Sequence, residues 1–122
     1  MAEVHTFDQI YEPITRHLGV SSNTSGSGAD LTLATRASGV RRLIGVTVKY
    51  SAAATVNVTV TLDSNLGATF DRLLNTIALA AETEGDFYPS HDVFMADGDT
   101  IKVFAPLLAA ETASVAIYYV AL

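Results

Sequence analysis

The chain has 122 residues, of which 49% are apolar and 16% charged, and its 13 acidic and 7 basic residues give a net charge of -6. This length indicates one domain, and the acidity makes contact with the phosphate backbone of nucleic acid unfavourable. The absence of cysteine excludes disulfides and thiolate chemistry. Because few charged residues are available to keep a small surface hydrated, we expect part of the apolar surface to contact a partner.

The N-terminus lacks the basic start and the apolar run of a secretory signal. No segment approaches the roughly 18 consecutive apolar residues of a membrane span. We therefore expect a soluble protein that is synthesised in the cytoplasm and does not enter a membrane.

Apolar side chains are scattered without a regular period over residues 1–20. We interpret this segment as an N-terminal arm that packs on the domain or on a neighbouring subunit, with Phe7, Ile10 and Tyr11 as interface candidates. Residues 21–30 form a Gly/Ser tract, which predicts a flexible loop. A phosphate-binding loop would need a preceding strand, a following helix and a lysine at fixed spacing, and all three are missing from this tract.

Residues 31–122 are interpreted as the folded domain, because strand-like alternation of apolar and polar side chains begins there. Strands are expected over residues 31–37, 41–51 and 54–63. The last of these, ATVNVTVTLD, places aliphatic side chains on one face and hydroxyl and amide side chains on the other. The short connection at residues 51–53 predicts an antiparallel hairpin between the second and third strands.

Segment 70–81 is ambiguous, because its apolar spacing and alanines favour a helix whereas its threonines and the neighbouring strands favour an extended run. We favour the strand, since a lone helix would displace a strand from the sheet. Residues 82–86 are interpreted as a polar loop. Further strands are expected over residues 87–95, where Pro89 fits only a strand start, a bulge or an edge, and over residues 100–106.

The last expected strand, residues 113–122, is apolar on both faces. A sheet with one solvated face should alternate, so we expect a partner to cover the face that carries Tyr118, Val120 and Leu122, and these residues are further interface candidates. Seven or eight short strands at regular spacing predict an all-β fold, an antiparallel β-sandwich resembling a jelly roll, with the N-terminal arm attached.

Residue types that carry chemistry do not form a convincing site. The histidines, His5, His17 and His91, are not in spaced pairs with a second ligand. Asp97-Gly98-Asp99 resembles a fragment of a calcium loop, but the further oxygen ligands at fixed offsets are missing and we favour an ordinary turn. We therefore predict no catalytic residues, no cofactor-binding residues and no metal ligands, and we expect a protein that is not an enzyme.

Acidic residues concentrate in one region of the sequence, which contains Glu82, Glu84, Asp86 and Asp92. A glycosidase would need two carboxylates facing each other across a sugar, so we favour a solvated acidic rim. Aromatic residues lie mostly on the expected strands and are predicted to be core or cross-strand pairs: Phe87, Tyr88, Phe94, Phe104, Tyr118 and Tyr119. An exposed row of them would instead suit polysaccharide binding or a subunit interface.

Three segments carry a resemblance to a known class of proteins: VTVTLDSNLGATFDRLL, FYPSHDVFMADGDTIKVFAP and the terminal SVAIYYVAL. Together they resemble small jelly-roll virion proteins of tailed bacteriophages over roughly residues 40–122. The resemblance implies a capsid cement or decoration protein that assembles as a homodimer or homotrimer on the outer surface of the capsid.

The leading hypothesis is a non-enzymatic structural virion protein that stabilises the phage head by bridging subunits of the major capsid protein. Its expected partners are that protein and further copies of itself, with no nucleic acid and no membrane. The alternatives are a carbohydrate-binding module and a β-sandwich accessory protein of a head fibre or tail.

Overall fold

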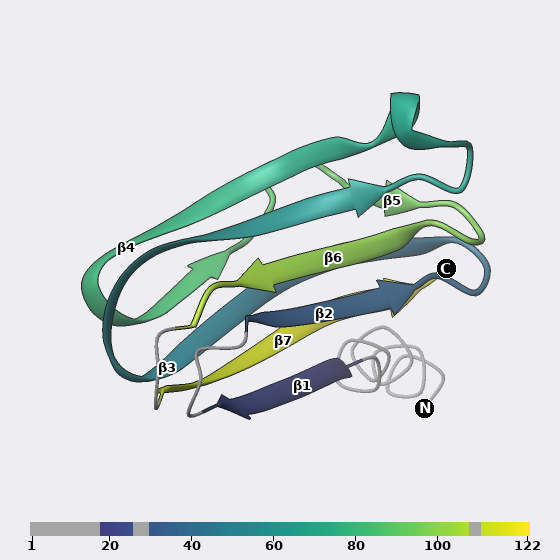
Figure 1. The fold of residues 1–122 in the computed structure, drawn as a ribbon. Helices are drawn as coiled ribbons and strands as arrows, with labels where there is room; N and C mark the ends of the chain where they lie inside the picture. The colour runs from purple at the N-terminus through teal and green to yellow at the C-terminus, as the bar shows by residue number, and fades with distance from the viewer. Residues whose placement is uncertain (1–17, 26–29, 108–110) are drawn as a thin grey trace, which may run out of the picture.

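The computed structural model describes residues 18–25, 30–107 and 111–122, which form an antiparallel β-sandwich (Figure 1). The all-β sandwich predicted from the sequence is therefore confirmed. A short 3₁₀ helix, η1 (Ala68–Phe70), lies between two of the strands. The strands are β1 (Leu18–Ser25), β2 (Leu31–Arg36), β3 (Arg41–Asp63), β4 (Arg72–Phe87), β5 (Phe94–Met95), β6 (Thr100–Ala105) and β7 (Glu111–Ala121).

Strand β3 belongs to both layers of the sandwich. Its first part, residues 41–50, pairs with β7, and its last part, residues 59–63, pairs with β6. The predicted hairpin at residues 51–53 is wrong, because β3 continues through these residues as one strand of 23 residues. The sequence there, Ser-Ala-Ala, offers no glycine, proline, asparagine or aspartate to close a tight turn, and the chain bends at register irregularities instead.

Strand β4 follows β3 around the same bend, so the two strands connect the layers. One layer contains β1, β7, the first part of β3 and the end of β4, and the other contains the start of β4, the last part of β3, β6 and β2. Figure 1 shows β4, the last part of β3, β6 and β2 side by side from the top of the view downward, with β7 and β1 below them.

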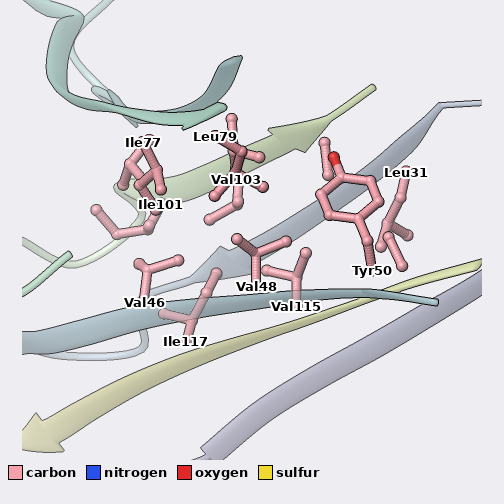
Figure 2. Close-up of a cluster of buried hydrophobic side chains, with 14 of the residues drawn as sticks. Leu31, Val46, Val48, Tyr50, Ile77, Leu79, Ile101, Val103, Val115 and Ile117 are labelled. Carbon is pink, nitrogen blue, oxygen red and sulfur yellow. The ribbon is translucent and has the colours of Figure 1, made fainter. Parts of the chain in front are cut away.

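The core lies between the layers and is built by the alternation seen in the sequence. On β3, Val58 and Val60 are fully buried, whereas Thr59 and Thr61 on the opposite face are half-buried. Each layer contributes aliphatic side chains that meet those of the other (Figure 2). The labelled members are Leu31, Val46, Val48, Tyr50, Ile77, Leu79, Ile101, Val103, Val115 and Ile117.

Close packing across the bend of β4 requires a residue without a side chain. A Cβ atom built on Gly85 would lie 2.6 Å from Cγ2 of Ile77 and 2.8 Å from Cδ2 of Leu79. Both neighbours are buried on the first half of the same strand, so an alanine at this position would overpack the core.

Several local predictions need correction. Residues 21–25 are part of β1 and not of a flexible loop, because backbone pairing with β7 does not depend on apolar side chains. Residues 82–86 are extended in β4 and not a loop, since they pair with β3. The expected strand over residues 87–95 is reduced to β5, whereas the preference for a strand over residues 70–81 is confirmed from Arg72 onward.

The predicted N-terminal arm, with Phe7, Ile10 and Tyr11, lies outside the described residues except for residues 18–20, which begin β1. In the described part of the chain, there is no helix with the length and apolar character needed to cross a membrane.

Candidate interaction surface

Three chain connections meet at one end of the sandwich, here called the loop end. They are residues 37–40 between β2 and β3, residues 64–71 between β3 and β4, and residues 96–99 between β5 and β6. In Figure 1 this end lies on the right, where the C-terminus also lies. The N–H of Leu122 donates to the carbonyl oxygen of Val40 at 3.0 Å, which ties the C-terminal residue to the first connection.

Two aspartates hold the three connections together. The carboxylate of Asp99, only 8% exposed, accepts the N–H of Asn65 at 2.9 Å and the N–H of Ala96 at 3.0 Å. The carboxylate of Asp97 accepts the N–H of Gly39 at 2.8 Å. Because the bonds from Asn65 to Asp99 and from Gly39 to Asp97 join segments far apart in the sequence, they fix the connections relative to one another.

The connection between β3 and β4 is also ordered internally. The carboxylate of Asp71 accepts the N–H of Ser64 at 2.8 Å, and the hydroxyl of Ser64 accepts the N–H of Leu66 at 3.1 Å. The N–H of Phe70 donates to the carbonyl oxygen of Gly67 at 3.0 Å. Side chains carried by this segment are therefore presented on a hydrogen-bonded scaffold.

Large apolar side chains are exposed mainly at the loop end. Of the eight that are exposed in the described residues, six lie on the connections, within two residues of them, or at Leu122, which is hydrogen-bonded to the first connection, and we call these six the loop-end apolar residues. They are Val40, Leu66, Phe70, Leu73, Phe94 and Leu122. The exposed fraction reaches 77% for Leu66 and 63% for Leu73. Exposed apolar side chains gathered on an ordered scaffold are typical of a protein interaction site.

The turn predicted for Asp97-Gly98-Asp99 is confirmed, and the contacts explain its composition. The carboxylates of both aspartates accept backbone N–H groups, as described above, so these residues close the loop end. Across the described residues, no three side chains of the types that bind metals are grouped closely enough to hold an ion.

A second feature is a groove of about 630 Å³ on the outer face of the layer formed by β7, β3 and β4. Its floor has small side chains, Thr47 and Ala116, and Glu84 and Asp86 line it from β4. The ammonium group of Lys49 lies 3.6 Å from a carboxylate oxygen of Glu84, and both side chains are about two-thirds exposed. The acidic residues of this region are thus solvated, as predicted.

Two tyrosines lie beyond one end of this groove. A Cβ atom built on Gly45 would lie 2.5 Å from a ring carbon of Tyr88, so the Tyr88 ring occupies the space that glycine leaves free. Tyr118 pairs with Gly45 from β7 on the other side. Tyr88 is exposed and Tyr118 is half-buried, which leaves ring surface available to a ligand.

The prediction that the strand aromatics are mainly core is wrong for Tyr88, Phe94 and Phe104, all of which are exposed. Phe87 and Tyr119 pack partly against the core, and the Tyr119 ring lies 4.6 Å from the guanidinium carbon of Arg41. The fully buried aromatic in the described residues is Tyr50. Its hydroxyl donates to the carbonyl oxygen of Pro106 at 2.8 Å.

The environment of Tyr50 changes its acidity. Burial and, as smaller contributions, the nearby carboxylates of Glu111 and Asp30 together raise the pKa of the Tyr50 hydroxyl to about 12. A neutral tyrosine whose buried ring is anchored by a hydrogen bond to a backbone carbonyl oxygen is a structural element of the core. It is not poised for proton transfer near neutral pH.

The interface candidates on the last strand lie close together, on one face and at the end of β7. Tyr118 and Val120 are half-buried beside Gly45 and Arg42 of β3, and Leu122 is 69% exposed. Sequence patterning missed Leu66, Phe70 and Leu73, because they follow no strand-like alternation. The available signal was three apolar residues in and beside a turn, where side chains are normally polar.

Comparisons with known proteins give a fold and no family. Neither known protein families nor characterised sequences match the chain. The structure is similar to the chitosan-binding module 1 of a chitosanase/glucanase from Paenibacillus sp. IK-5, with a TM-score of 0.53 and 10% identity over 81% of this chain and 74% of that chain. At such identity the similarity establishes the sandwich architecture alone.

Weaker similarities extend to two assembled proteins. The Drosophila NLP core, described for pentamer formation and histone binding, has a TM-score of 0.45 and 10% identity over 84% of this chain and 97% of that chain. A capsid structure of Helicobacter pylori bacteriophage KHP30 has a TM-score of 0.41 and 11% identity over 84% of this chain and 93% of that chain.

Proposed function

We propose that this chain is a non-enzymatic structural protein of a phage virion, a capsid cement or decoration protein that bridges subunits of the major capsid protein on the outer surface. The observation that carries the proposal is the set of loop-end apolar residues, presented on connections that Asp97 and Asp99 hold together. The net charge of -6 suits an exterior position better than contact with packaged DNA. The sequence resemblance to small virion proteins supports the same role.

The physical mechanism is multivalent docking. Burying two or three exposed apolar side chains contributes about 1.5–3 kcal/mol each, which gives weak binding for one copy. Many weak contacts of this kind, repeated over a shell, would together oppose outward pressure on the shell. A rigid loop end favours this use, because little conformational entropy is lost when it docks.

The test replaces Leu66 and Phe70 with serine and measures rebinding to heads that lack the protein. Since both side chains are exposed in the free protein, L66S/F70S should fold normally and bind heads at least about tenfold more weakly. The matched control is Phe104→Ser, because Phe104 is also exposed but lies on the outer face of β6. Equal rebinding of L66S/F70S and the wild type would refute docking through the loop end.

A second candidate function is carbohydrate binding, which Tyr88 and Tyr118 beside the groove favour. Aromatic rings next to carboxylates and hydroxyls suit a sugar that stacks and donates hydrogen bonds. A glycan array should then show binding that is lost in Tyr88→Ala and in Tyr118→Ala. A silent array with the wild type would count against this candidate.

A further inference from the structure

Strand β4 is a long edge strand. In the described residues it pairs with β3 along one side, and no strand pairs with its other side. Figure 1 shows β4 along the upper margin of the sandwich. Unpaired N–H and C=O groups along such an edge can pair with another extended chain.

The amino-acid composition of this edge does not prevent β4 from pairing with a strand of another chain. Residues 73–81, LLNTIALAA, contain no charged residue, proline or glycine, and residues 73–80 span about 26 Å of extended chain before the positive φ of Ala81. Natural edge strands are usually short or contain charged residues or prolines, and these features prevent pairing with the edge of another sheet. The other edge of the same layer, β2, follows that rule, since it has six residues and ends at Arg36.

Charged residues flank the uncharged stretch with opposite signs. Arg72 precedes it and Glu82 follows it, and both are exposed. An antiparallel partner of identical sequence would bring the Arg72 end of one strand beside the Glu82 end of the other, twice in each pair. Parallel pairing would instead place like charges together.

We infer that a second copy of this chain pairs with the first by antiparallel addition of β4 to β4, about a two-fold axis at Ile77. This register places Thr76 of each copy opposite Ala78 of the other, and both side chains are exposed in the single chain. The buried side chains of Ile77 and Leu79 face inward, so the two cores would continue across the new pair. Leu73, 63% exposed, would be covered by the second copy.

The dimer can be tested independently of the virion role, because of the loop-end apolar residues it covers only Leu73, which lies on β4, and not Leu66 or Phe70. The two proposals therefore fail separately. L66S/F70S should lose binding to heads and keep the dimer mass, whereas a β4 variant should lose the dimer mass whether or not heads are the target.

Light scattering after size exclusion tests the register with charge pairs. T76K/A78K places lysine opposite lysine, and should raise the dissociation constant of the dimer at least about thirtyfold and halve the observed mass from twice 12.9 kDa. T76K/A78E places lysine opposite glutamate and should retain the dimer. The matched control T32K/A34K makes the same two exchanges at exposed positions of β2, and should also retain it.

A covalent test does not depend on how the lysine variants fold. Since the chain has no cysteine, T76C/A78C introduces the only thiols, and paired strands place these Cα atoms within the 4.4–6.8 Å that a disulfide spans. Oxidation should give a disulfide-linked dimer, while T32C/A34C should not. A wild type of monomer mass, or a T76K/A78K variant of unchanged mass, would overturn the inference.

Discussion

Replacing Asp99 with alanine should loosen the loop end, because this carboxylate accepts N–H groups from two different connections. Both bonds, to Asn65 and Ala96, have a charged acceptor, and such bonds contribute about 1.5–3 kcal/mol each. Solvent can reach part of this region, so we use the lower value and expect a loss of about 3 kcal/mol. For a domain of this size, that corresponds to a fall in Tm of about 10 °C.

Urea unfolding and amide hydrogen exchange measure the two parts of this effect. Asp99→Ala should lower the unfolding midpoint and speed exchange at Asn65 and Ala96, while the Leu43 amide, which donates to Val93, should change little beyond the global effect. Asp99→Asn keeps one acceptor oxygen and should lose about half as much stability. An unfolding free energy within 0.5 kcal/mol of the wild type, on the order of the scatter for surface substitutions, would refute the role assigned to Asp99.

Three further outcomes are expected. The pKa of Tyr50 is raised to about 12 in the folded state, so the contribution of its neutral hydroxyl to the free energy of unfolding is present below pH 10 and is lost as the pH rises towards 12. The free energies of unfolding at pH 9 and pH 11 should therefore differ by about 1 kcal/mol more in the wild type than in Tyr50→Phe. Val60→Ala removes a fully buried side chain and should cost about 2–3 kcal/mol by urea unfolding, against less than about 1 kcal/mol for the adjacent, half-buried Thr59→Ala. Deleting residues 1–17, which leaves β1 intact, should abolish retention on heads yet preserve the circular dichroism of the sandwich, and unchanged retention would refute the role of the arm.

Alternation predicted the layers well, because burial on one face of a strand demands a period of two. The valines and threonines around Val60 show this directly, since one set is buried and the other half-buried. The bend of β3 was not predictable from the same pattern. Alternation continues through a bend, and only the pairing with both β7 and β6 shows that one strand serves two layers.

The interaction surface was less predictable than the core. Tyr118 and Val120 were visible in the sequence because their strand is apolar on both faces, and they are only half-buried. The loop-end residues have no period, and their exposure depends on three connections meeting in space. Asp99 was visible as a turn residue, but its bond to Asn65 joins positions 34 residues apart and requires the folded chain.

The surfaces proposed here can be separated experimentally because they occupy different parts of the sandwich. Docking to a shell would use Leu66 and Phe70 at the loop end, self-association would use the free side of β4, and a sugar would contact Tyr88 and Tyr118. If dimers form through β4, each carries two loop ends and can bind two shell subunits at once. Breaking the β4 pair should then weaken retention on heads through lost bivalency, while the affinity of a single loop end stays the same. Comparing T76K/A78K with L66S/F70S in one rebinding assay distinguishes these cases, since only L66S/F70S should lower the affinity of the single site.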